Sequence, residues 1–195
     1  MNAIVSQRRQ YHRHACVRIG LGWCLRVIGD RWGVTLAETT RPYPCDDLVP
    51  DPVLQAWRGV TVHATPERVW PWVAQIRLAP YSYDSIDNLG RRSPQDLRGL
   101  PEPVVGESFT AALGGHRFGR IVAIESGKHL TGTIMGAVIS YVLVPIDDVA
   151  HTRLLMKLVT AGGRMTATLL TLGDLIMARR QLLNLKALAE RTAAP

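Results

Sequence analysis

The chain has 195 residues, of which 47% are hydrophobic, and a formal net charge of +7. This length is sufficient for one domain with a substantial core and an appended segment. The charge is unevenly spread: residues 1–33 carry six arginines and one aspartate, whereas residues 34–195 carry 17 basic and 15 acidic residues. Because the excess lies in an N-terminal arm and the rest is nearly balanced, the composition excludes a nucleic-acid-binding domain.

The three cysteines, Cys16, Cys24 and Cys45, form no C-x-x-C pair and cannot all be paired. An odd number without regular spacing is not a disulfide framework, which favours a reducing, cytoplasmic location.

The N-terminal arm, residues 1–33, contains the apolar stretch 15–29. Arg18 and Arg26 interrupt this stretch, so it falls short of the roughly 20 apolar residues of a membrane-spanning helix. It also has no small-residue cleavage site of the kind that ends a signal peptide. Two alternatives stay open: a partly helical or disordered arm, or a basic amphipathic helix that makes weak contact with an anionic membrane surface.

The segment 34–57 is rich in prolines and aspartates, which favour turns, and we expect an irregular connector packed on the domain. The domain itself is predicted over 58–195. It opens with alternating apolar residues from Gly59 to Ala64, typical of a half-buried strand. Thr65 is placed to cap a following helix, with Pro66 in its first turn and Pro71 bending it.

Further along, the pattern predicts a short helix over 82–89, a loop over 91–104 and then strands separated by tight turns. The expected strands are 109–113, 118–124, 130–134, 137–144 and 152–160, with Gly114-Gly115 as a hairpin turn. They form an antiparallel meander with one covered face, on whose outer side Arg153 is expected to form a salt bridge. A long amphipathic helix over 166–191 ends the chain, and the sheet is expected to curl around it, giving an α+β fold.

The words A-T-P-E-R-V-W-P-W-V-A-Q and Y-S-Y-D-S-I-D-N, followed by a T-R-L strand and a C-terminal helix ending L-K-A-L-A-E, resemble the SRPBCC superfamily. Within it the chain is similar to proteins grouped with polyketide cyclases, dehydrases and lipid-transport proteins, over about residues 32–191. The resemblance implies a helix-grip (START-like) fold, with a cavity between the sheet and the final helix that holds apolar ligands.

The ligand cavity would be lined by inward-facing strand residues and by the apolar stripe of the final helix. A stripe of this kind is also what a plain hydrophobic core requires. The candidate ligand-binding residues are Trp70, Phe109, Phe118, Ile139, Tyr141, Met156, Leu169, Leu172 and Ile176.

Candidate catalytic groups are fewer. Tyr83 precedes Asp84, Asp87 and Asn88, whose spacing puts them on one helix face, where a carboxylate could act as a general base. Such residues also serve simply as helix caps. His116 and His129 lie in expected strands and could move a proton or polarise a carbonyl. The candidate catalytic residues are Tyr83, Asp84, His116 and His129.

No zinc-type histidine or cysteine spacing, G-x-S-x-G elbow or P-loop is present in the sequence. We therefore expect neither a metal nor a cofactor. The leading hypothesis is a carrier or sensor that binds a small hydrophobic ligand, such as a lipid or a polyketide. The alternatives are a cofactor-independent cyclase or dehydratase, and a peripheral membrane protein that acts through residues 1–33.

Overall fold

A computed structural model describes residues 30–148, 150–161 and 164–193, and for residues 164–176 and 193 it describes the backbone alone. The helices are α1 (Leu36–Thr40), α2 (Pro66–Ala74), the 3₁₀ helix η1 (Gln75–Leu78), α3 (Asp84–Asp87) and α4 (Arg164–Ala193). The strands are β1 (Arg31–Trp32), β2 (Leu54–Val62), β3 (Thr110–Ala112), β4 (His116–Phe118), β5 (Arg120–Glu125), β6 (His129–Ile134), β7 (Ala137–Ile146) and β8 (His151–Thr160).

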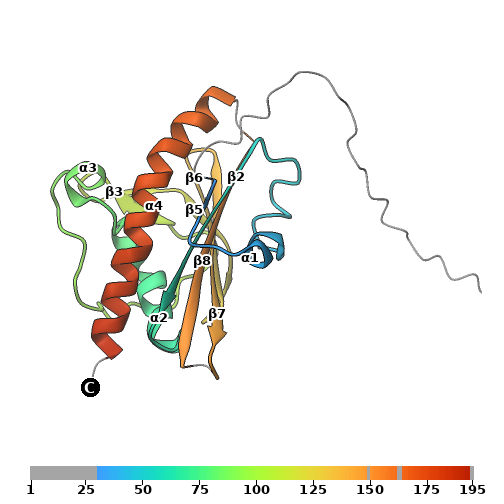
Figure 1. Cartoon of the computed structure of the whole chain (residues 1–195). Coiled ribbons are helices and arrows are strands. Elements are labelled where there is room, and N and C mark those ends of the chain that lie inside the picture. Colours follow the sequence, from blue (N-terminus) through green and yellow to red (C-terminus); the bar gives the residue numbers. More distant parts are fainter. Residues whose placement is uncertain (1–29, 149, 162–163, 194–195) are drawn as a thin grey trace, which may run out of the picture.

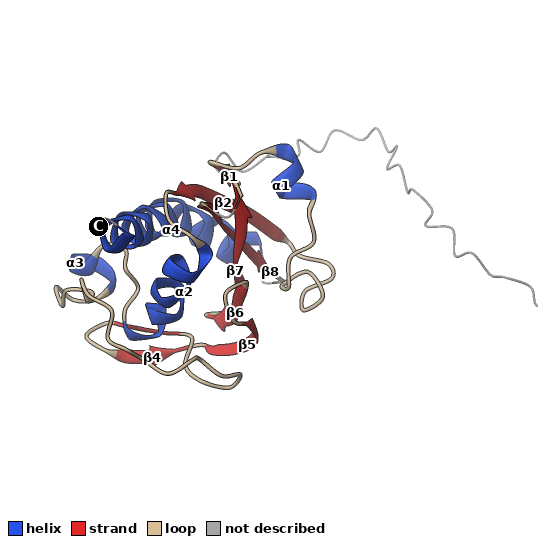
Figure 2. Ribbon diagram, turned by 90° about the horizontal axis from the view of Figure 1, so that it is seen from below, coloured by secondary structure: helices blue, strands red, loops and turns tan. Residues whose placement is uncertain are grey.

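Six strands form one sheet in the order β1-β2-β8-β7-β6-β5, and β3 pairs with β4 in a separate two-stranded sheet. All pairs are antiparallel except β1 with β2. The long helix α4 and the shorter α2 cover one face of the six-stranded sheet, while α1 lies on the other (Figures 1 and 2). This arrangement confirms the predicted helix-grip fold.

Side-chain alternation along the strands gives each face of the sheet its own core. On β8, Leu154 and Met156 belong to the inner core with α2 and α4, whereas Leu155 and Val159 belong to an outer cluster. The outer cluster is covered by Tyr43 and other residues of the connector. The expectation of one covered face was therefore incomplete, because the connector supplies a third layer.

The connector is also more regular than predicted. Thr35 caps α1 through a capping box in which its hydroxyl accepts from the Glu38 N–H and the Glu38 carboxylate accepts from the Thr35 N–H. In the sequence, this capping box is indicated by a threonine three residues before a glutamate. β2 likewise starts at Leu54, five residues before the predicted strand.

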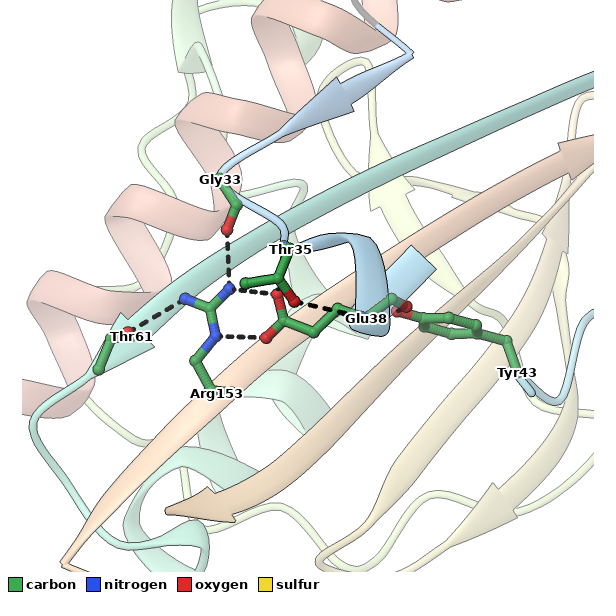
Figure 3. A network of polar contacts seen from close by, with 6 residues as sticks. All are labelled: Gly33, Thr35, Glu38, Tyr43, Thr61 and Arg153. Carbon is green, nitrogen blue, oxygen red and sulfur yellow. Dashed lines mark hydrogen bonds and ion pairs between the residues drawn. The ribbon is translucent and has the colours of Figure 1, made fainter. Parts of the chain in front are cut away.

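An arginine on β8 fixes this connector to the sheet (Figure 3). The Arg153 guanidinium donates to both carboxylate oxygens of Glu38, to the Gly33 carbonyl and to the Thr61 hydroxyl. The predicted outer position of Arg153 and its salt bridge are confirmed, and the carboxylate partner comes from α1.

The helix α2 begins at Pro66 as predicted, but the Thr65 side chain makes no capping hydrogen bond. The helix continues past Pro71 to Ala74 and then tightens into η1. The short helix α3 is capped by Tyr83 in place of Ser82 and spans four residues, half the predicted length.

Candidate functional site

A cavity of about 130 Å³ lies between the inner face of the sheet and α4. The rest of its lining comes from η1, from the 80–87 segment, and from Phe109 and Thr110 at the start of β3, and the cavity is partly open to solvent. Its lining consists of Ile76, Pro80, Ser82, Asp87, Phe109, Thr110, Ile134, Ile139, Tyr141, Met156, Met177, Ala178 and Gln181.

Strand alternation places four of the predicted ligand-binding residues in this lining: Phe109, Ile139, Tyr141 and Met156. Ile139 and Tyr141 are two residues apart on β7, and Tyr141 is paired in register with Met156 on β8. The Phe109 ring, just before β3, lies against Gly132, where an added Cβ would be 2.0 Å from a ring carbon. The glycine therefore allows an aromatic wall at this end of the cavity.

The other predicted ligand-binding residues lie elsewhere or outside the described side chains. Trp70 is buried in the core, and its Nε1–H donates to the Glu102 carboxylate. Phe118 lies on β4, which leaves the main sheet to pair with β3, so its alternation does not lead into the cavity. The side chains of Leu169, Leu172 and Ile176 lie outside the described residues.

Among the described residues of the lining, one side chain is acidic, that of Asp87 at the end of α3. Asp87 is 8% exposed, and within the described part of the chain neither of its carboxylate oxygens has a protein group in hydrogen-bond geometry. The Ser82 hydroxyl, also in the lining, likewise has no group in hydrogen-bond geometry among the described residues. It is nevertheless close enough to Asp87 to favour the ionised form of that carboxylate. A buried carboxylate normally has several partners, so this end of the cavity has unused hydrogen-bonding capacity.

The other polar groups of the lining already have partners. The Tyr141 hydroxyl donates to Gln181 Oε1 at 2.6 Å, and Gln181 Nε2 donates to the Pro80 carbonyl at 2.6 Å. The Thr110 hydroxyl donates to the Ile76 carbonyl at 2.8 Å. Asp87 and Ser82 are thus the groups best placed to meet the polar end of a ligand.

Burial raises the pKa of Asp87 above the usual value of an aspartate, and the nearby Asp84 adds to this effect. The Ser82 hydroxyl and two backbone N–H groups act in the opposite direction without cancelling the shift. A carboxyl whose charged form is disfavoured by burial in an apolar cavity has the character of a proton donor or acceptor.

The two acidic-segment candidates, Tyr83 and Asp84, line a different, polar hollow of about 410 Å³ on the other side of the 81–85 segment. Asp84 accepts from both the N–H and the hydroxyl of Ser93, which is a structural role. The Tyr83 ring is 37% exposed and lies 5.7 Å from the Arg180 guanidinium. Neither side chain lines the cavity.

The two histidine candidates are also outside the cavity. His116 is exposed on β4. His129 begins β6 next to Leu130, which faces the inner core, so alternation turns His129 to the outer face. Burial lowers the pKa of His129, and Glu125 lies 3.9 Å away.

Within residues 30–148, 150–161 and 177–192, no group of three or more histidine, cysteine or acidic side chains is arranged to hold a metal ion. None of the helices in the described part of the chain has the length and hydropathy needed to cross a bilayer. The predicted membrane contact through residues 1–33 falls almost entirely outside the described residues, which begin at Asp30.

Several solved structures are similar to this one. A protein from Nitrosomonas europaea is 13% identical with a TM-score of 0.49, over 71% of this chain and 95% of its own. A Polyketide_cyc-like protein from Corynebacterium glutamicum is 12% identical with a TM-score of 0.45, over 71% and 93%. A protein from Thermobifida fusca is 23% identical with a TM-score of 0.46, over 70% and 91%.

No protein-family model and no curated protein matches the chain. The element order, the antiparallel sheet and the C-terminal helix across its inner face are those of a helix-grip fold, the fold that the sequence resemblance implied.

Proposed function

We propose that the protein binds a small, largely apolar ligand in the cavity between the sheet and α4, with a polar group of the ligand meeting Asp87. The supporting observation is the combination of an apolar lining with the buried carboxyl of Asp87, which has no hydrogen-bonded partner among the described residues. Ligand sites typically combine apolar walls with a few polar groups that fix orientation.

The size of the cavity limits the part of a ligand that it can enclose. A cavity of about 150 Å³ holds a benzene molecule, so the 130 Å³ here accommodates one ring-sized group. Burying ~150 Å² of apolar surface gains roughly 4 kcal/mol, which corresponds to about millimolar affinity even before entropy costs are subtracted. Tighter binding therefore requires a hydrogen bond, for which Asp87 is the available acceptor.

A carboxylate acceptor favours ligands that carry a hydroxyl or an amine. Four compounds that share one ring test this point: benzylamine, benzyl alcohol, toluene and benzoate, titrated at pH 8 and followed by NMR shifts of the cavity methyl groups. We expect the amine and the alcohol to bind more tightly than toluene, and benzoate to bind least. Equal binding of all four to the wild type and to Asp87→Asn contradicts the assignment of Asp87.

Occupancy of the cavity is tested by native mass spectrometry of protein purified from its own host. Ala178 is buried on α4 in the lining, so Ala178→Phe fills the space from the helix side. Ala37→Phe is a matched control, because Ala37 is exposed on α1 at the opposite face of the sheet. We expect a co-purified small molecule in the wild type and in the control variant, and its loss from Ala178→Phe. Undiminished ligand in Ala178→Phe would overturn the cavity as the binding site.

The buried carboxyl also favours a second candidate function, acid–base catalysis of a cyclisation or dehydration. Asp87 is placed to accept or donate a proton at the polar end of the cavity. A dehydratase lacking this group would retain its substrate, so the molecule bound to Asp87→Asn would be heavier by one water than the molecule bound to the wild type. Identical masses exclude the dehydration, and identical masses with identical chromatographic retention of the two bound molecules favour the carrier over a cyclisation that conserves mass.

A further inference from the structure

Three large apolar side chains are exposed together on the side of the molecule that carries α3 and the β3–β4 turn. Ile86 is 65% exposed, Leu89 69% and Leu113 45%. They come from two segments, the end of α3 with the residues that follow it, and the turn between β3 and β4.

One backbone hydrogen bond and one from a side chain hold these two segments side by side. The Leu113 N–H donates to the Asp87 carbonyl at 2.7 Å, and Arg91 Nη1 donates to the Gly114 carbonyl at 3.2 Å. A Cβ added to Gly114 would lie 3.8 Å from Leu89 Cδ1. The apolar side chains therefore belong to one surface, and the carbonyl that joins the segments belongs to the cavity residue Asp87.

Two of these leucines have a backbone conformation that leucine rarely adopts. Leu89 has φ of 50° and Leu113 has φ of 48°, in the left-handed region that favours glycine and asparagine. Folding alone would favour a small or polar residue at such exposed positions. Packing within the chain thus explains neither the conformation nor the exposure of these side chains.

The exposed charged side chains of residues 86–92 and 113–117 are all arginines. Arg91, Arg92 and Arg117 are exposed in the same two segments, whose one acidic residue is the buried Asp87. Arg91 and Arg117 also line an adjacent hollow of about 400 Å³ together with Arg77, which is paired with Glu107. Exposed apolar side chains flanked by arginines complement the apolar boundary and the phosphate groups of an anionic lipid bilayer.

We propose that this leucine–arginine face, consisting of Ile86, Leu89, Arg91, Arg92, Leu113 and Arg117, binds the surface of an anionic membrane. The leucines enter the headgroup boundary, while the arginines contact lipid phosphates. This places the Asp87 side of the cavity next to the bilayer. The proposal does not depend on what the cavity holds, and it concerns a different part of the chain from the N-terminal arm.

The test is sedimentation of the full chain with vesicles of phosphatidylcholine alone and of phosphatidylcholine with one-quarter phosphatidylserine. Leu89→Asn together with Leu113→Asn removes the apolar contacts with a residue that tolerates positive φ. We expect the thermal midpoint of this double variant to be equal to or above that of the wild type, while binding to anionic vesicles falls about tenfold or more. A merely structural role for the leucines predicts the opposite, a lower midpoint with unchanged vesicle binding.

The matched control is Leu36→Asn with Leu48→Asn. These leucines are 69% and 48% exposed in the connector, close to the exposures of Leu89 and Leu113. We expect the control variant to bind anionic vesicles as the wild type does. Equal losses in the two double variants, or no wild-type binding to anionic vesicles, would overturn the proposal. So would loss of all binding on replacing Arg8, Arg9 and Arg13 with glutamine while Leu89→Asn/Leu113→Asn binds normally, because the arm would then be the membrane contact.

Discussion

Arg153 and Glu38 form a two-point ion pair, with Arg153 Nε 2.7 Å from Glu38 Oε1 and Nη2 3.0 Å from Oε2. The two side chains are each 17% exposed. Parallel N–H···O bonds of this kind are stronger and more directional than a single contact. Because Arg153 lies on β8 and Glu38 on α1, the pair joins the connector layer to the centre of the sheet (Figure 3).

Replacing Glu38 with glutamine should lower the free energy of unfolding by about 2 kcal/mol, since it leaves a partly buried guanidinium without its carboxylate. Urea denaturation measures this change. Asp51→Asn is the control, because Asp51 is exposed in the same connector and makes no ion pair among the described residues. A similar loss in both variants would mean that net charge, and not the pair, is responsible.

The contribution of Glu38 should also depend on pH. Although burial raises the pKa of Glu38, the hydrogen bonds from Arg153 and the Thr35 N–H outweigh it and hold the pKa below the usual 4.5. A lowered folded-state pKa gives stability that is present above the unfolded value and is lost as pH falls through the folded value. The difference between the wild type and Glu38→Gln should thus be full at pH 6 and shrink towards pH 3. A difference that is constant over this range would contradict the ionic origin.

The ionisation of Asp87 should change the stability of the fold in the opposite direction. Because burial raises its pKa, the ionised carboxylate destabilises the fold at neutral pH, and this penalty is relieved as pH falls towards the usual aspartate value of 3.8. We expect Asp87→Asn to raise the unfolding free energy at pH 7 by about 1 kcal/mol.

The neighbouring Asp84 supplies the control for Asp87. Its carboxylate accepts two hydrogen bonds from Ser93, so Asp84→Asn should be destabilising under the same conditions. Thermal unfolding of the two variants at pH 7 should give midpoint shifts of opposite direction. A lower midpoint for Asp87→Asn would mean that this carboxylate has a stabilising partner.

Gly132→Ala should disturb the cavity through Phe109. The added Cβ would lie 2.0 Å from Phe109 Cδ2, so the ring must move, at a cost of about 1–3 kcal/mol. Chemical denaturation of Gly132→Ala, Phe109→Leu and the double variant measures the coupling between the two positions. We expect the smaller leucine to recover most of the loss caused by the alanine. Additive losses would show that the strain does not pass through the ring.

On the outer face, Lys157 is 5% exposed, ion-paired with Asp46, and lies 5.0 Å from the centre of the Trp57 ring and 5.4 Å from that of Tyr43. Asp46→Asn should lower the unfolding free energy by about 3 kcal/mol, because the buried ammonium loses its counter-ion. Adding Lys157→Met should restore much of that loss, since an apolar side chain of similar length fits between the rings. If the double variant is as unstable as the single one, the ring contacts hold the cation without the carboxylate.

The fold could be predicted from sequence because its longest elements have clear periodicity. The alternation of Leu154, Met156 and Leu158 with Arg153, Leu155 and Lys157 gave both the strand and its two faces. The connector helix was missed because prolines and aspartates dominate its surroundings, although Thr35 and Glu38 have the spacing of a capping box.

The cavity was harder to predict than the fold because it depends on how elements are placed relative to each other. Phe118 alternates correctly but lies on a hairpin that leaves the main sheet. Asp84 and Asp87 share a helix face in sequence, yet Asp84 turns to Ser93 and Asp87 to the cavity. Their spacing of three residues in the sequence could not show which of the two faces the cavity, because the direction of α3 is set by contacts with residues far along the chain.

The connector layer has a consequence for where the independently folding unit begins. Tyr43 and Cys45 pack on Trp57, Val138, Val142, Leu155 and Val159, so a fragment starting at residue 58 would leave an apolar sheet face bare. Large exposed apolar faces associate with one another in water. Such a fragment should be recovered as aggregates, and a fragment from Asp30 as a monodisperse species, an outcome that would make the proline-rich connector part of the folding unit.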